Sequence, residues 1–184
     1  MSTKVLIPFA AGFEEMEGII LADVLRRGGV NVVTASLSEG PVLAARKTSH
    51  LADILLSEVS EMDFDLILLP GGLEGTKNLQ NSDLLKSMVL RQNEKGNKIG
   101  AICAAPNALR SWGVIRENDP FTAFPTSISS SNGGEYISQR IVSHNNIFTS
   151  VGPGSAFEFA LFLLELLEGK EIRKKVEDGL LLPK

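Results

Sequence analysis

The sequence of 184 residues carries a formal net charge of −4, with 43% hydrophobic and 22% charged residues. These values are ordinary for a globular protein of one domain, and the negative charge gives no general attraction to nucleic acid or to an anionic membrane. The single cysteine excludes an intramolecular disulfide and a multi-cysteine metal site, and two histidines argue against a histidine-rich metal centre. No stretch approaches the roughly 20 apolar residues that span a bilayer. Because the N-terminus also lacks a signal-peptide pattern, we expect a soluble, cytoplasmic protein.

Apolar runs and amphipathic segments alternate through the first half of the chain. Short apolar runs are typical of buried parallel strands, and they predict strands at 5–7, 30–35 and 64–69. Between them we expect a helix over 13–27 that glycines end, a hairpin of strands at 41–46 and 49–51, and a short helix at 57–62.

The second half continues this alternation. Ser82 is a candidate N-cap for a helix over 83–95, and a strand ending at Ile102 leads into a helix that opens at Ala104. The elements expected after these are a strand at 119–124, a loop at 127–134, a hairpin of strands at 140–143 and 147–150, and helices at 156–167 and 170–178. The alternation predicts an α/β fold: one domain over 1–184 with a doubly wound, mostly parallel sheet and helices on both faces.

The only cysteine stands where an apolar run meets small residues, in KIGAICAAPNAL. A strand that turns into a helix through one residue presents that residue at the carboxyl edge of the sheet. A helix opening at Ala104 would direct its free N–H groups and positive dipole end at the Cys103 thiol, which predicts a lowered pKa. The alternative is a buried structural cysteine. This stretch alone supports the two interpretations equally.

Two other strand ends would open onto the same edge of the sheet. After the first strand come three glutamates, of which Glu17 lies beside the apolar stripe and is expected to point to the core. Glu14 and Glu15 are expected to complement the helix dipole. A buried Glu17 is a candidate for a protonated partner of the thiolate or for a general acid and base. Gly71 and Gly72 follow the strand at 64–69 and could aim N–H groups at an oxyanion, or form a plain turn.

Neither histidine is expected to serve Cys103 as a base. His144 lies at a predicted hairpin turn, where solvent exposure explains it better than catalysis. His50 lies in a segment far from the strands whose ends are expected to form the site. A cysteine–histidine–acid triad is therefore not supported, and the glycine spacings of dinucleotide and phosphate loops are absent.

Four motifs in order, EEME after the first strand, LPGG, AICAAP and TSxGPG, resemble the ThiJ/PfpI superfamily. The resemblance covers nearly the whole chain and is strongest to the branch of the parkinsonism-associated deglycase and its bacterial relatives. It implies a flavodoxin-like, glutamine amidotransferase-like fold with a nucleophile elbow, and a homodimer. It assigns the reactive cysteine to Cys103 and its hydrogen-bonding glutamate to Glu17. The backbone donors fall on Gly72 and Ala104, with Gly71 adjoining.

Other pocket positions follow from the same resemblance. Arg46 matches a family arginine near the crevice, and Ser150 belongs to the last motif. Where animal members carry a histidine before a proline, this chain has Phe124 and Pro125, and Val151 replaces an arginine. Both replacements make the expected pocket less polar and remove a proton carrier.

The resemblance implies a cofactor-free, cysteine-dependent enzyme of the glyoxalase III or deglycase type. Its substrates would be methylglyoxal and other small carbonyl compounds, or glycated thiols and amines, and it would protect against carbonyl and oxidative stress. The alternative is a redox sensor or chaperone in which Cys103 is oxidised to sulfinate without turnover. The peptidase-like relatives carry a histidine where this chain has Ala104, which disfavours peptidase activity. We expect no metal, cofactor, membrane or nucleic-acid partner.

Overall fold

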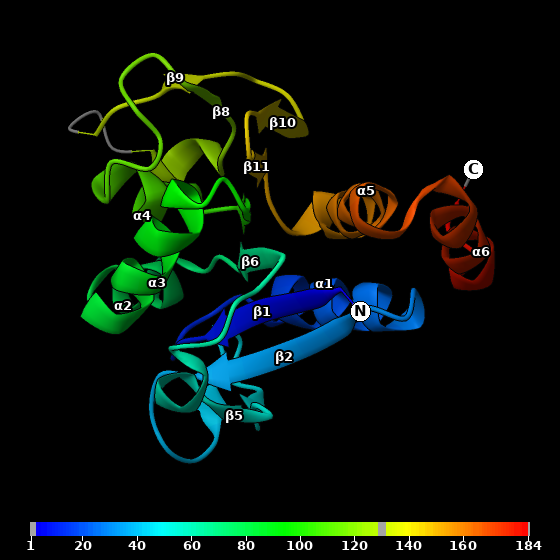
Figure 1. The fold of residues 1–184 in the computed structure, drawn as a ribbon, viewed down its shortest axis with the longest axis horizontal. Coiled ribbons are helices and arrows are strands. Elements are labelled where there is room, and N and C mark those ends of the chain that lie inside the picture. Colours follow the sequence, from blue (N-terminus) through cyan, green and yellow to red (C-terminus); the bar gives the residue numbers. More distant parts are fainter. Residues whose placement is uncertain (1–2, 129–131, 184) are drawn as a thin grey trace.

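The computed structural model describes residues 3–128 and 132–183. Its centre is a seven-stranded sheet in the order β10-β11-β7-β6-β1-β2-β5 (Figure 1). The strands of this sheet are β1 (Lys4–Phe9), β2 (Asn31–Ser36), β5 (Ile54–Leu55), β6 (Leu66–Leu69), β7 (Lys98–Ile102), β10 (Ile141–His144) and β11 (Ile147–Ser150). Within this sheet the β10–β11 pair is antiparallel and the other pairs are parallel, so the predicted mostly parallel sheet is confirmed.

Helices cover both faces of the sheet, as predicted (Figure 1). One face carries α1 (Glu15–Arg27) and α5 (Ala156–Glu168), which pack on each other, with α6 (Lys170–Leu180) against α5. The other carries α2 (Leu73–Gln80), α3 (Asp83–Glu94) and α4 (Pro106–Ser111). Single 3₁₀ turns occur at Leu56–Val59, Pro125–Ser127 and Pro153–Ser155. Within the described residues, no helix combines the length and the apolar character that a membrane crossing needs.

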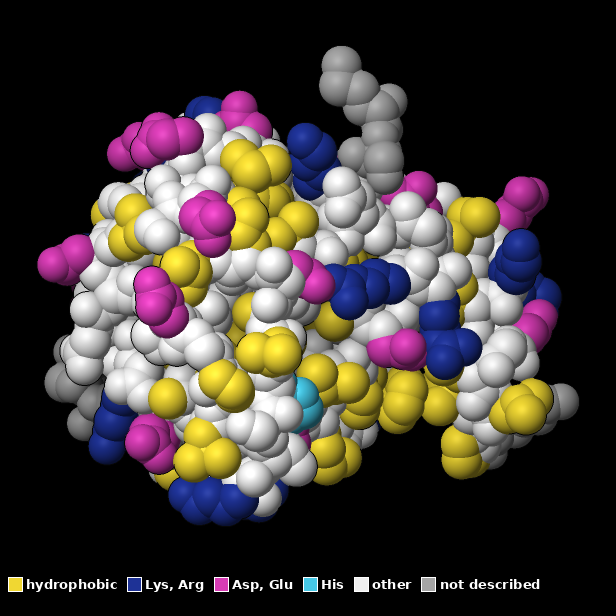
Figure 2. Space-filling view, turned by 90° about the horizontal axis from the view of Figure 1, so that it is seen from below, with side chains coloured by type: hydrophobic (Ala, Val, Ile, Leu, Met, Phe, Trp, Pro, Cys, Tyr) yellow, Lys and Arg dark blue, Asp and Glu magenta, His cyan; other side chains and the backbone are white. Residues whose placement is uncertain are grey.

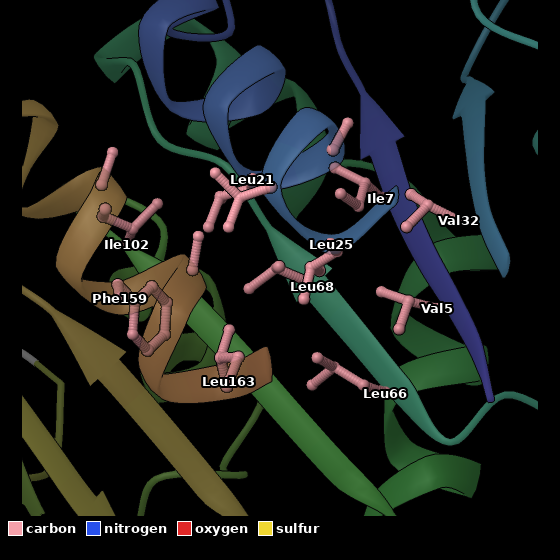
Figure 3. Packing of buried hydrophobic residues seen from close by; sticks show 14 of the residues in the cluster. Val5, Ile7, Leu21, Leu25, Val32, Leu66, Leu68, Ile102, Phe159 and Leu163 are labelled. Atoms are coloured by element: carbon pink, nitrogen blue, oxygen red, sulfur yellow. The ribbon is translucent and has the colours of Figure 1, made fainter. Parts of the chain in front are cut away.

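The core lies on both sides of the sheet because its central strands are apolar along their whole length. On β1, Val5 and Ile7 join the cluster under α1 and α5, whereas Leu6 joins the cluster under the other helices. Figure 3 shows side chains of α1 and α5 meeting those of the central strands in the first cluster. This arrangement holds β1, β6 and β7 rigidly side by side, with their carboxyl ends at one edge.

Most predicted elements are confirmed, including the hairpin of β3 (Val42–Leu43) and β4 (Ser49–His50). Ser82 caps α3 by accepting a hydrogen bond from Leu85 N at 3.2 Å. The expected strand at 119–124 is reduced to β8 (Pro120–Phe121), which pairs outside the main sheet with β9 (Glu135–Tyr136). The expected loop at 127–134 falls partly outside the described residues.

Two elements near the crevice differ from expectation. Helix α4 begins at Pro106, because Ala104 and Ala105 form a turn first. Helix α2 was not predicted, since its sequence LEGTKNLQ follows two glycines and contains a third, which is typical of a loop. Gly75 is required there, because a Cβ on it would lie 2.6 Å from the Phe13 backbone. This glycine therefore lets α2 pack close to the loop between β1 and α1.

Candidate active site

Cys103 sits on a sharp turn directly after β7. Its φ is 63°, in the left-handed region that costs an L-residue roughly 1–2 kcal/mol. Two backbone hydrogen bonds hold this conformation: Cys103 N donates to Ser150 O at 2.9 Å, and Phe124 N donates to Cys103 O at 2.8 Å. Backbone strain maintained by its surroundings is typical of a functional position. The structure therefore has the strand-to-turn elbow that the sequence predicts.

Glu17 projects from the first turn of α1 toward this elbow. Its side chain is 0% exposed, as expected for the glutamate that points to the core. Glu17 Oε2 accepts a hydrogen bond of 2.7 Å from Gly71 N. Glu17 Oε1 has no partner of regular hydrogen-bond geometry among the described residues. Burial raises the pKa of Glu17 to about 7, and the charge of Glu14 adds to this rise. Near neutral pH this carboxyl can thus both take and give a proton.

The prediction of a lowered thiol pKa is wrong for this structure. Burial, followed by the neighbouring Glu17 carboxylate, raises the pKa of Cys103 to about 12. The N–H groups of Gly72 and Ala104 do point to the sulfur and lower its pKa, as the sequence predicts, but they do not offset burial and a like charge. Protonation of Glu17 removes the like charge from beside the sulfur, whereas the burial that contributes most to the raised pKa of Cys103 remains.

Gly71 and Gly72 follow the end of β6, and neither position has room for a side chain. A Cβ on Gly71 would lie 2.6 Å from Cys103 Cβ and 2.7 Å from Glu17 Oε2. Gly72 has a φ of 88°, and a Cβ on it would collide with the Gly12 carbonyl oxygen. These glycines are therefore more than a plain turn, because they let backbone N–H groups approach the thiol and the carboxyl.

A surface cavity of about 310 Å³ opens at Cys103. Four other residues predicted for the site line it, namely Arg46, Gly72, Ala104 and Phe124. The structure thus brings together residues from four separate segments of the chain at one edge of the sheet.

Two predicted pocket residues lie elsewhere. Ser150 is fully buried, and its hydroxyl hydrogen-bonds Ser155 Oγ at 2.7 Å and the Arg140 carbonyl at 3.0 Å. Its contribution to the site is the carbonyl that holds the Cys103 N–H. Pro125 is exposed at the start of a 3₁₀ turn and is not among the residues lining the cavity.

Glu14 is a cavity residue that the sequence interpretation missed. It is the N-cap of α1, is 8% exposed, and lines the cavity with Cys103. Its side chain makes no hydrogen bond that caps α1. The usable signal was its spacing, since residues three apart lie on one side of a helix and Glu17 faces the thiol. Glu15 instead accepts hydrogen bonds from Arg46 N and Thr48 Oγ1, both at 2.9 Å.

Neither histidine contacts Cys103. His50 Nε2 lies 2.7 Å from Thr48 Oγ1, and its ring meets the edge of Phe13. His144 Nε2 lies 3.3 Å from Asp119 Oδ1 at the end of β10. This geometry agrees with the expectation that neither histidine serves Cys103 as a base. In the described part of the chain, no group of three or more His, Cys, Asp and Glu residues could hold a metal ion.

Comparison with known proteins agrees with this fold. The model of the DJ-1/PfpI family matches residues 3–166. Protein dj-1beta of Drosophila melanogaster is 41% identical over 184 residues, which cover 98% of each chain. Its crystal structure matches with a TM-score of 0.93 and 39% identity over 100% of both chains.

Two further relatives differ in length. The glutathione-independent glyoxalase DJR-1.2 of Caenorhabditis elegans is 36% identical over 170 residues, 92% of this chain and 90% of the relative. Protein DJ-1 homolog B of Arabidopsis thaliana is 39% identical over 169 residues, but the match spans only 39% of that protein. Because the family model spans most of the chain and full-length relatives share its flavodoxin-like fold, the chain belongs to the DJ-1/PfpI family.

Proposed function

We propose that this protein is a cofactor-free, cysteine-dependent enzyme that converts methylglyoxal, or its adducts with thiols and amines, to lactate. One observation carries the proposal: a buried glutamate with a pKa of about 7 adjoins the only cysteine at an open cavity. General bases work best when their pKa lies near the operating pH. The similarity to a relative named as a glutathione-independent glyoxalase supports the same reaction class.

In the first step, the Glu17 carboxylate takes the Cys103 proton as the sulfur bonds to the aldehyde carbon of methylglyoxal. The raised pKa of the thiol makes this base necessary. The N–H groups of Gly72 and Ala104, which already point to the sulfur, are placed to stabilise the oxygen that becomes negative. Glu17 then returns the proton to this oxygen, which gives a neutral hemithioacetal.

In the second step, Glu17 removes the hydrogen from the former aldehyde carbon as a proton, and an enediolate forms. Glu17 delivers that proton to the adjacent carbon, and the hydroxyl proton on the first carbon's oxygen passes to the oxygen of the second, so the ketone becomes an alcohol and the first carbon becomes a thioester. Water hydrolyses the thioester, releases lactate and restores the thiol. The oxidation of one carbon balances the reduction of its neighbour, so no external redox partner is needed. From an adduct, the Cys103 sulfur replaces the amine or thiol on the former aldehyde carbon, and the released group takes the Cys103 proton through Glu17.

The test is a methylglyoxal consumption assay without glutathione on wild type, Cys103→Ala and Glu17→Gln. We expect turnover by wild type and a loss of at least about a hundredfold in both variants, as is usual when an acid–base group is removed. Absence of wild-type turnover contradicts the proposal, and turnover that survives Cys103→Ala contradicts the mechanism.

The redox alternative has a separate signature. Peroxide acts on thiolates, and the raised pKa of Cys103 disfavours that form, so turnover is the stronger candidate. A wild-type protein that consumes no aldehyde but gains two oxygen atoms at Cys103 under mild peroxide, measured by mass spectrometry, would support a redox sensor. Because either role needs a reduced thiol, a reducing compartment such as the cytoplasm suits both.

We also propose a homodimer formed through α1 and the neighbouring β3–β4 hairpin. Figure 2 shows hydrophobic side chains gathered on one face of the molecule. Apolar side chains with substantial exposure occur on both elements: Met16 is 54% exposed and Leu51, directly after β4, is 76% exposed. The Glu15 bonds to Arg46 N and Thr48 Oγ1 tie the helix to the hairpin, so these residues belong to one surface. A second copy would bury this area.

A further inference from the structure

Phe124 places a large aromatic ring at the mouth of the active-site cavity. The residue is 41% exposed, and it lines the same cavity as Cys103. An exposed phenyl ring in a concave site is apolar surface that a ligand can cover. The proposed reaction on methylglyoxal does not use this ring.

The position of Phe124 is coupled to the nucleophile through the backbone. Its N–H donates to the Cys103 carbonyl at 2.8 Å, and its own carbonyl accepts from Ser127 N at 2.9 Å and Ser127 Oγ at 2.7 Å. A Cβ on Gly152 would lie 3.2 Å from Phe124 Cδ2 and 4.0 Å from Cys103 Sγ. The ring and the sulfur therefore border the same glycine.

The cavity is larger than a three-carbon aldehyde needs. Its volume of about 310 Å³ is at the lower end of the roughly 300–1,000 Å³ that accommodates drug-sized ligands. Ala45, Leu73 and Pro153 add apolar surface to the lining of the same cavity. The cavity therefore has room for a substituent next to the carbon that Cys103 would attack, and apolar side chains line that space.

Building on the proposed function, we propose that Phe124 determines specificity by selecting 2-oxoaldehydes with an aryl or other large apolar substituent. The substituent packs on the ring while Cys103 Sγ bonds to the aldehyde carbon. The steps remain those given above, so phenylglyoxal and water yield mandelate with no added oxidant or reductant. An aromatic pair contributes roughly two- to tenfold in binding beyond the area that it buries.

The test compares kcat/KM for phenylglyoxal and methylglyoxal, from initial rates of mandelate and lactate formation, in wild type and Phe124→Ala. We expect the variant to lose about tenfold on phenylglyoxal, mainly through KM, and less than about threefold on methylglyoxal. Phe124→Tyr retains the ring and should restore the wild-type ratio of the two kcat/KM values.

Phe157→Ala is the matched control, since Phe157 is also a partly exposed aromatic residue, at 38%, but does not line the cavity. It should leave the ratio unchanged. If wild type turns over both aldehydes and Phe124→Ala leaves the ratio unchanged, the specificity inference is wrong while the proposed function stands. If wild type turns over neither aldehyde, both proposals fail.

Discussion

The protonation of the Cys103 thiol is coupled to that of the Glu17 carboxyl. Burial places the pKa of Glu17 at about 7 and, together with the Glu17 charge, that of Cys103 at about 12. The first proton is thus lost from the carboxyl, and in the proposed reaction the thiol then gives its proton to the carboxylate during addition. This order makes Glu17 the group that sets the pH dependence of the site.

Glu17 should also make stability depend on pH. Its pKa is raised from 4.5 to about 7 in the folded protein, so between these values the folded state holds a proton that the unfolded state has lost. Stability therefore falls as pH rises through this window, by about 3 kcal/mol. Glu17→Gln should abolish this fall, which urea unfolding at pH 4 to 8 would measure.

Glu15→Gln is the control for this prediction because its shift has the opposite sign. Although burial raises the pKa of Glu15, hydrogen bonds from its own backbone, Thr48 and Arg46 together hold it below its ordinary value. Glu15 thus contributes stability above its unfolded pKa that is lost as pH falls through the folded pKa. Equal pH profiles for Glu17→Gln and wild type would show that Glu17 does not carry a raised pKa.

At the scale of elements, the site depends on how closely the end of β6 approaches the end of β7 and the start of α1. Gly71 is the point of contact among the three, since it lies against Cys103 and donates its N–H to Glu17. Parallel strands hold these ends together because the ladder from Leu66↔Lys98 to Leu69↔Ala101 sets their register. The pairing of the strands therefore sets the positions of these backbone segments, independently of the side chains of the site.

Gly71→Ala should disrupt the site more than the fold. The added methyl group would lie 2.6 Å from Cys103 Cβ and 2.7 Å from Glu17 Oε2, so one of these groups must move. We expect at least a tenfold loss of kcat/KM for methylglyoxal and a stability loss of about 1–3 kcal/mol. The matched control is Gly154→Ala, where a Cβ meets nothing within 4 Å. Full activity in Gly71→Ala would argue against the tight geometry.

At the scale of the whole molecule, exposed apolar residues on α1 and beside the hairpin predict self-association. The double substitution Met16→Lys with Leu51→Lys places two positive charges on that surface, and like charges facing each other in a symmetric contact are unfavourable. We expect wild type to sediment as a dimer at micromolar concentration and the variant as a monomer in analytical ultracentrifugation.

Leu181→Lys provides the control for the dimer prediction, because Leu181 is 88% exposed but follows α6. It should sediment like wild type. A monomeric wild type, or dissociation by the control alone, would contradict the proposed interface.

The sequence by itself determined the fold class, because apolar runs such as Leu66–Leu69 suit only strands buried on both sides. It also predicted that Cys103, Glu17, Gly72 and Ala104 lie close together, since residues at the carboxyl ends of parallel strands share one edge and the motifs resemble a known family. These inferences rest on local pattern and on topology, which the order of residues encodes.

Only the tertiary structure decided the electrostatics and the shape of the site. The helix dipole seen in sequence predicts a lowered thiol pKa, but burial and the nearby Glu17 carboxylate raise it. Likewise, Glu14 faces the cavity and Ser150 does not, although both stand in motifs of the site. Desolvation and packing depend on which atoms surround a group in three dimensions, and residues far apart in the chain supply those atoms.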